Sequence, residues 1–228
     1  KEDALKKLFN QSRVALIYGA AGTGKSTMVD YIARHFNDKK KLFLAHTNPA
    51  IDNLKRKVEA QNSYFWTISS QIGRNTYGQE YDLLVIDECS TVSNSDLLKV
   101  LEKTHFKLLV LVGDAYQIES IEFGNWFEII RSFIPSTSVF ELTTPYRTKN
   151  DALLGFWTKV RNIDEDITEA VARNGYSTVL DKTLFETQGR DEIILCLNYD
   201  GLYGINNINR FLQSSNSGAA ITWGDSTY

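Results

Sequence analysis

The sequence predicts an α/β fold built on a mostly parallel β-sheet with helices on its faces. Short apolar runs alternate with helical patterns along the chain, an order of elements typical of this class. Several of the runs are apolar throughout, such as LLVI at 83–86, as expected for parallel strands buried on both faces. With 228 residues, of which 43% are hydrophobic and 23% charged, the chain is long enough for a sizeable core.

The predicted elements follow one another in a regular order. Apolar runs predict strands at 14–18, 42–45, 64–68, 83–86, 108–112, 139–142 and 192–197. Periodic segments predict helices at 25–36, 50–60, 95–104, 125–133, 152–162 and 205–213. Asn94 or Ser95 is expected to cap the third of these helices.

The organisation along the chain suggests two domains. A more polar stretch with weaker periodicity, 162–191, reads as connecting structure after the first set of strands. We therefore expect a first domain over residues 1–147 and the start of a second over 148–228. The chain opens on a helix-like segment and ends at TWGDSTY without a closing element, so we expect it to be part of a longer protein.

Composition argues against several classes of protein. No apolar run approaches the roughly 20 residues of a membrane span. The formal net charge is -3, so a globally basic nucleic-acid binder is not indicated, although a local track of positive charge remains compatible. Cys89 and Cys196 stand beside apolar runs, and we expect both to be buried free thiols of a cytoplasmic protein.

The stretch GAAGTGKST fits the complete pattern G-x-x-x-x-G-K-[ST], after an apolar strand and before a helical pattern. Its residues are Gly19, Ala20, Ala21, Gly22, Thr23, Gly24, Lys25, Ser26 and Thr27. Glycines allow consecutive N–H groups to face a phosphate, and the helix N-terminus adds the positive end of its dipole. Lys25 is expected to reach the β- and γ-phosphates and Ser26 to ligate Mg²⁺. The pattern therefore predicts a site for ATP.

A second motif, DLLVIDE at 82–88, is an apolar strand that ends in two acids. Asp87 stands where a Walker B aspartate would hold Mg²⁺, directly or through water. Glu88 would lie at the carboxyl end of the strand, beside the phosphate loop, where it can polarise an attacking water as general base. An acidic turn after an apolar strand is common, but the complete phosphate loop upstream favours a Mg²⁺-dependent nucleoside triphosphatase.

Three further segments sharpen this prediction: LAHTNPAIDNL at 44–54, GDAYQI at 113–118, and the pair Tyr146-Arg147. In this order and spacing, the five motifs closely resemble those of a superfamily 1 helicase, well over 13–150 and more loosely beyond. The resemblance implies a P-loop NTPase with a RecA-like first domain and the beginning of a second RecA-like domain. GDxxQ resembles the RecD-like branch and TNPAIDNL the Upf-like branch, which usually track 5′ to 3′.

The resemblance also implies a role for each matching residue. Gln117 would sense the γ-phosphate and couple it to nucleic acid. Arg147 would be an arginine finger, which in other phosphoryl-transfer systems contributes about 10³–10⁵ in rate. Tyr146 would stack on the adenine base. The expected contacts to phosphates of a single strand are Thr47, Asn48 and Thr67.

Each of these residues has a structural alternative. Gln117 could be an ordinary turn residue, Arg147 a partner in an ion pair, and Tyr146 part of the core. Thr47 and Thr67 could simply cap turns at the ends of their strands.

Four residues near these threonines have weaker functional signals. The aromatic run Tyr64, Phe65 and Trp66 suggests base stacking, but at least two of the three are expected to pack on the sheet. His46 stands where many relatives have proline, and we expect a structural or loop-exposed role for it.

Some helicase features are missing. The glutamine that often contacts adenine is not evident, and TLFETQG at 183–189 is interpreted as a chance likeness to motif V. Motifs V and VI are expected to lie outside this chain. Residues 55–81 leave little room for an inserted domain, which favours a minimal motor ATPase core.

Three hypotheses remain from the sequence. The first is an ATP-dependent nucleic-acid translocase or helicase, with single-stranded nucleic acid as partner, DNA rather than RNA favoured, no membrane, and a monomer favoured. The second is an ATP-gated switch that binds nucleic acid or protein without moving along it. The third is a P-loop ATPase without a nucleic-acid role, against which the GDxxQ and Tyr-Arg motifs argue.

Overall fold

A computed structural model describes residues 13–74, 79–114, 126–177 and 194–214, with the backbone of the pairs 222–223 and 226–227. The chain divides into two units, Lys1–Glu165 and Asp166–Tyr228. The domain boundary predicted after residue 147 stays a prediction.

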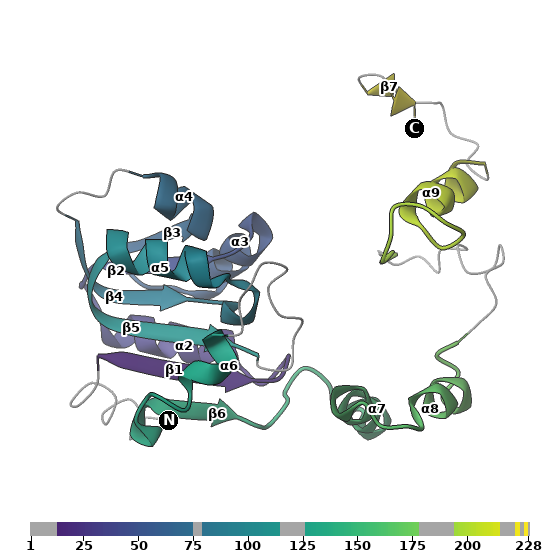
Figure 1. The fold of residues 1–228 in the computed structure, drawn as a ribbon, viewed down its shortest axis with the longest axis horizontal. Helices are drawn as coiled ribbons and strands as arrows, with labels where there is room; N and C mark the ends of the chain where they lie inside the picture. Colours follow the sequence, from purple (N-terminus) through teal and green to yellow (C-terminus); the bar gives the residue numbers. More distant parts are fainter. Residues whose placement is uncertain are drawn as a thin grey trace. The chain divides into compact units, whose positions relative to one another are not determined.

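The first unit holds a six-stranded sheet in the order β3-β2-β4-β5-β1-β6, with every neighbouring pair parallel (Figure 1). The strands are β1 Val14–Gly19, β2 Lys41–Ala45, β3 Ser63–Thr67, β4 Glu80–Ile86, β5 His105–Gly113 and β6 Val139–Leu142. The α/β class and six of the seven predicted strands are confirmed, with bounds shifted by a few residues.

Helices lie between these strands and after the last of them. They are α2 Lys25–His35, α3 Asn48–Lys57, α4 Ile68–Gly73, α5 Asn94–Lys103, α6 Trp126–Ile130 and α7 Asp151–Asn162, with short 3₁₀ turns at Cys89–Thr91 and Ser136–Ser138. The sequence pattern missed α4. It also misplaced the cap of α5, because that helix already begins at Asn94 and the hydroxyl of Ser93 accepts the hydrogen bond of the Asp96 N–H.

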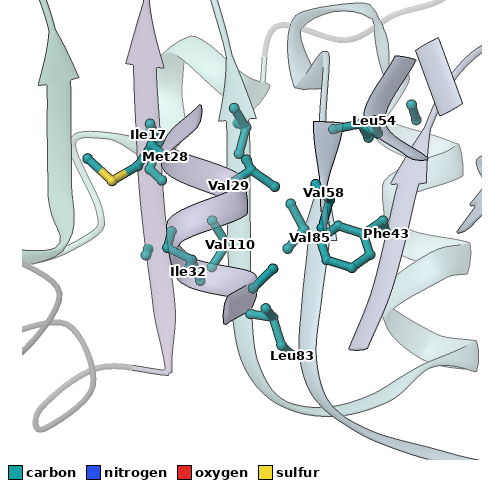
Figure 2. Close-up of a cluster of buried hydrophobic side chains, with 14 of the residues drawn as sticks. Ile17, Met28, Val29, Ile32, Phe43, Leu54, Val58, Leu83, Val85 and Val110 are labelled. Carbon is teal, nitrogen blue, oxygen red and sulfur yellow. The ribbon is translucent and has the colours of Figure 1, made fainter. Parts of the chain in front are cut away.

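The two faces of the sheet are covered by different helices, which gives three layers (Figure 1). On one face, α2 and α3 pack on the sheet. Figure 2 shows Val29 and Ile32 of α2 among strand residues such as Phe43, Val85 and Val110. On the other face, α4, α5 and α6 cover a second cluster. This burial on both faces explains why the central strands are apolar throughout.

The strand order decides which loops meet. Because β4, β5 and β1 are neighbours and parallel, their carboxyl ends lie at one edge of the sheet. The phosphate loop after β1, the acidic turn after β4 and Asp114 after β5 are thereby brought together. The carboxyl ends of β2 and β3 lie next along the same edge.

The second unit contains α8 Ile167–Arg173, α9 Ile205–Ser214 and the antiparallel pair β7 Thr222–Trp223 and β8 Ser226–Thr227. The strand predicted at 192–197 is wrong over its described part, since residues 194–197 form no strand. Leu195 and Leu197 are 87% and 100% exposed, so no packing stabilises an extended conformation there. Cys196 is only partly buried, unlike Cys89, which is fully buried. Among the described helices, none is both long enough and apolar enough to cross a membrane.

Candidate nucleotide-binding site

The phosphate loop has the backbone geometry that its glycines predict. Gly22 and Gly24 have φ angles of 81° and 90°, a region that other residues rarely adopt. Gly24 is also the N-cap of α2 and provides no side-chain hydrogen bond to the first turn. The N-terminus of α2 therefore presents backbone N–H groups without a capping side chain, together with the positive end of the helix dipole.

Lys25 lies inside this loop. Its ammonium group donates hydrogen bonds to the carbonyl oxygens of Gly19 and Ala20 at 2.7 and 2.9 Å. Burial lowers the pKa of Lys25. The carboxylates of Asp114 and Asp87 oppose this effect, and the positive charges of Arg147 and Arg161 add to it. A bound phosphate would supply the negative charge that stabilises the protonated form of this buried ammonium.

A cleft of about 450 Å³ lies in front of the loop. The sequence-predicted residues that line it are Ala21, Gly22, Gly24, Lys25, Ser26, Thr27, Asp87, Glu88, Tyr146 and Arg147. Thr23 instead donates to the carbonyl of Ala20 at 2.8 Å and lines a smaller cavity of about 170 Å³ beside Tyr146. The structure thus brings the predicted phosphate, metal and base residues to one place.

The two acids occupy different positions in this cleft. Asp87 accepts a hydrogen bond from the Glu88 N–H at 2.9 Å, and burial raises its pKa. Glu88 has a φ angle of 55°, in the left-handed region, which turns the chain sharply after β4. Burial and the neighbouring Asp87 raise the pKa of Glu88, while His46 and Lys25 lower it.

These groups fit a magnesium ion held together with a triphosphate. Mg²⁺ in nucleotide sites takes one or two carboxylates and completes its shell with phosphate oxygens and water. Asp87 and the Ser26 hydroxyl line one cleft, and the buried carboxylate of Asp87 gains from a nearby cation. Among the described residues, no group of three or more acidic, histidine or cysteine side chains is placed to hold a metal ion.

The segment with Tyr146 and Arg147 packs against the phosphate loop. The Tyr146 N–H donates to the carbonyl of Gly22 at 2.8 Å, and a Cβ placed on Gly22 would lie 2.6 Å from the Cβ of Arg147. Tyr146 is 70% exposed at the mouth of the cleft, so its alternative role in the core is wrong. The stacking of Tyr146 on adenine and the contact of Arg147 with the γ-phosphate stay predictions.

Sequence reasoning assigned no role to four residues that lie at or beside this cleft. Asn53 and Lys57 stand four residues apart on one face of α3 and line the cleft. Asp114 also lines it and is 4% exposed. Arg161 of α7 lies 3.7 Å from Asp114. The i,i+4 spacing on α3 was visible in the sequence, whereas the approach of α7 to β5 required the fold.

The predicted nucleic-acid residues lie at the neighbouring part of the sheet edge. Ala45 pairs with Thr67 at the ends of β2 and β3. Thr47 caps α3 and Thr67 caps α4, each accepting a backbone N–H at 3.3 and 3.2 Å respectively. Thr47 and Asn48 are exposed and Thr67 is partly exposed. A capping hydroxyl keeps its own proton to donate, so capping and phosphate contact are compatible, and that contact stays a prediction.

The aromatic run of β3 packs on the sheet, as expected. Phe65 stacks on Phe43 with ring centroids 4.8 Å apart, and Tyr64 meets Tyr81 edge to face at 6.1 Å. Trp66 is covered by the guanidinium of Arg74, 3.6 Å from its ring centroid. His46 is exposed, as predicted. Gln117 and the segment 183–189 lie outside the described residues.

Comparison with known proteins agrees with this geometry. The sequence profile of the AAA domain family matches residues 2–181. The chain belongs to the AAA domain family. No curated protein sequence is significantly similar to it.

Solved structures give the fold of this AAA domain. The Pif1 helicase from Candida albicans has a TM-score of 0.61 at 21% identity, over 97% of this chain and 55% of that one. The Bacteroides Pif1 helicase in complex with ADP-AlF3 and ssDNA has a TM-score of 0.61 at 18% identity, over 96% and 58%. Bacteroides sp Pif1 in complex with ADP-AlF4 has a TM-score of 0.59 at 16% identity, over 97% of this chain and 57% of that one.

These likenesses confirm the RecA-like P-loop fold predicted from the motifs. They do not distinguish the RecD-like from the Upf-like branch. The chain spans a little more than half the length of the three helicases.

Proposed function

We propose that this chain is the ATPase core of an ATP-dependent helicase or translocase that acts on single-stranded DNA. The observation that carries the proposal is the cleft where Lys25, Glu88 and Arg147 converge on the phosphate loop. It is supported by a fold shared with Pif1 helicases, one of which binds both ADP-AlF3 and ssDNA. The proposal applies to the larger protein that such a core would serve.

The residues of the cleft have different roles in ATP hydrolysis. The loop amides and Lys25 bind and orient the phosphates, which accounts for most of the catalysis in phosphoryl transfer. Glu88 accepts a proton from the water whose oxygen attacks the γ-phosphorus, and ADP leaves. The raised pKa of Glu88 suits a general base. Arg147 is placed to neutralise charge that develops on the γ-phosphate.

A magnesium ion held by Ser26 and Asp87 would neutralise charge on the β- and γ-phosphates when bound. Asp87 would hold that ion, and the hydrogen bond from the Glu88 N–H fixes the orientation of its carboxylate. Tyr146, exposed at the mouth of the cleft, is available to stack on the base.

The nucleic-acid contacts are proposed for the ends of β2 and β3. The hydroxyl groups of Thr47 and Thr67, together with Asn48, would donate hydrogen bonds to the phosphates of one strand. Such contacts read the backbone and carry no sequence information. We propose a monomer in the cytoplasm as the working form.

The test is a strand-displacement assay with the full-length protein and a forked DNA duplex. ATP-dependent release of the labelled strand, lost in Lys25→Ala, is the expected result. A protein that binds single strands in an ATP-dependent way but releases no strand, and does not displace streptavidin from a biotinylated end, would instead be the ATP-gated switch. A protein indifferent to DNA in both assays would contradict the proposal.

A further inference from the structure

Helix α7 lies beside the phosphate loop, separated from it by a second cavity. This cavity has a volume of about 590 Å³. Ala20 and Ala21 of the loop line one side, and Leu154, Trp157 and Ile163 from α7 and its end line another. Because a cavity intervenes, the apolar side chains of α7 that line it do not pack closely on the described residues of the loop at this place.

A polar contact crosses the gap. Arg161 of α7 lies 3.7 Å from the carboxylate of Asp114, which follows β5 directly. The side chain of Asp114 is 4% exposed, and that of Arg161 is 32% exposed. A carboxylate buried to this degree requires compensating positive charge, and loss of one partner of a buried ion pair is costly.

This carboxylate also lines the proposed nucleotide site. Asp114 lines the phosphate cleft together with Lys25 and Arg147, and Arg147 lines both cavities. Without Arg161, the negative charge of Asp114 would repel the phosphates that Lys25 attracts. With Arg161, the pair has no net charge. The charges of Asp114 and Arg161 both act on Lys25, which places them within electrostatic reach of the phosphate site.

We propose that Arg161 is a positioning residue of the nucleotide site. By pairing with Asp114 it neutralises a buried carboxylate beside the phosphates and holds α7 against the phosphate loop, so that Arg147, which precedes α7, keeps its place. The inference rests on the proposed nucleotide site and extends it. Because a triphosphate carries more negative charge than a diphosphate, loss of Arg161 weakens triphosphate binding more.

The test measures the affinities of the chain for ADP and for a non-hydrolysable ATP analogue, both with Mg²⁺. Arg161→Ala is expected to lower the affinity for the analogue about tenfold and that for ADP less. Arg161→Lys, which keeps the charge, should lose less than Arg161→Ala. Adding Asp114→Asn to Arg161→Ala should restore most of the analogue affinity, because position 114 then carries no negative charge. Lys159→Ala, on the same helix but outside both cavities, should change neither affinity.

Thermal unfolding of each variant separates this role from a purely structural one. A structural ion pair would lower the melting temperature and weaken both nucleotides by the same factor, and that result would overturn the inference. So would an Arg161→Ala variant that binds like Lys159→Ala, or a double variant that recovers nothing. Wild-type protein that binds neither nucleotide would overturn the proposed function, and this inference with it.

Discussion

The helices that begin at the functional edge of the sheet start in two opposite ways. The N-cap of α2 is Gly24, which offers its first turn no side-chain hydrogen bond, whereas Thr47 and Thr67 cap α3 and α4 through their hydroxyl groups. An uncapped end keeps its N–H groups for a ligand, and a capped end has already paired one of them. A side chain that serves the uncapped end, such as that of Lys25, can therefore change with little loss of stability, while the two threonines carry stability as well as any contact with nucleic acid.

The largest expected effect is on the uncapped side. Lys25→Ala should reduce ATP turnover at least about a hundredfold, because the ammonium group binds and orients the phosphates. The melting temperature should change little, since within the described part of the chain Lys25 donates its hydrogen bonds to carbonyls of its own loop. Turnover and thermal unfolding are measured together, with Lys55→Ala on the exposed side of α3 as control. A large drop in stability would contradict the comparison.

A change in the loop backbone should affect both binding and stability. Gly22→Ala places a Cβ 2.6 Å from that of Arg147, at a φ angle of 81°. We expect nucleotide affinity to fall about tenfold or more and unfolding free energy to fall by about 1–3 kcal/mol. Gly155→Ala is the matched control: its Cβ would meet nothing within 4 Å in the middle of α7, and the variant should be slightly more stable. Denaturant unfolding and nucleotide titration check both.

Two kinds of substitution at Thr47 and Thr67 separate helix capping from contact with nucleic acid. Thr47→Ala and Thr67→Ala should each lower the unfolding free energy by about 1 kcal/mol, because a cap is lost. Thr47→Asp and Thr67→Asp keep a good cap acceptor but lose the donor and place a negative charge beside a phosphate. We expect them to retain stability and lose single-strand affinity.

Fluorescence anisotropy with a labelled oligonucleotide, beside thermal unfolding, reports both properties. If the aspartate variants bind single strands like wild type, the threonines only cap their helices and the nucleic-acid site lies elsewhere.

The smallest effect is expected at the opposite end of the sheet. The ammonium of Lys107, 2.7 Å away, and the Lys40 N–H hold the pKa of Asp82 below its ordinary value of 3.8. A lowered folded-state pKa stabilises the protein above the unfolded value, and that contribution is lost as the pH falls through the folded value. Asp82→Asn should therefore lower the melting temperature by about 1–3 °C at pH 7.

The difference between Asp82→Asn and wild type should shrink as the pH drops below 3.8. ATP turnover at pH 7 should not change, since Asp82 lies away from the cleft. A difference in melting temperature that stays constant down to low pH would contradict this assignment.

The features that could be predicted from the sequence are those with a local pattern. Continuous apolar strands and glycine-rich turns are local patterns, so the sheet, the phosphate loop and the Asp87-Glu88 turn were predicted from the sequence. The short helix α4 has too few turns for a periodic signal. The pairing of Arg161 with Asp114 joins residues 47 positions apart, and no local pattern predicts it. The run at 194–197 has the composition of a strand, but a strand also needs neighbours that bury it.

ATP turnover by the full-length protein, with and without a single-stranded DNA oligonucleotide and in parallel with Glu88→Gln, tests the account most directly. We expect turnover to be stimulated several-fold by the strand, and to be lost in Glu88→Gln while nucleotide binding persists. Turnover that is the same with and without the strand would contradict the motor, and turnover that survives in Glu88→Gln would contradict the assignment of the base.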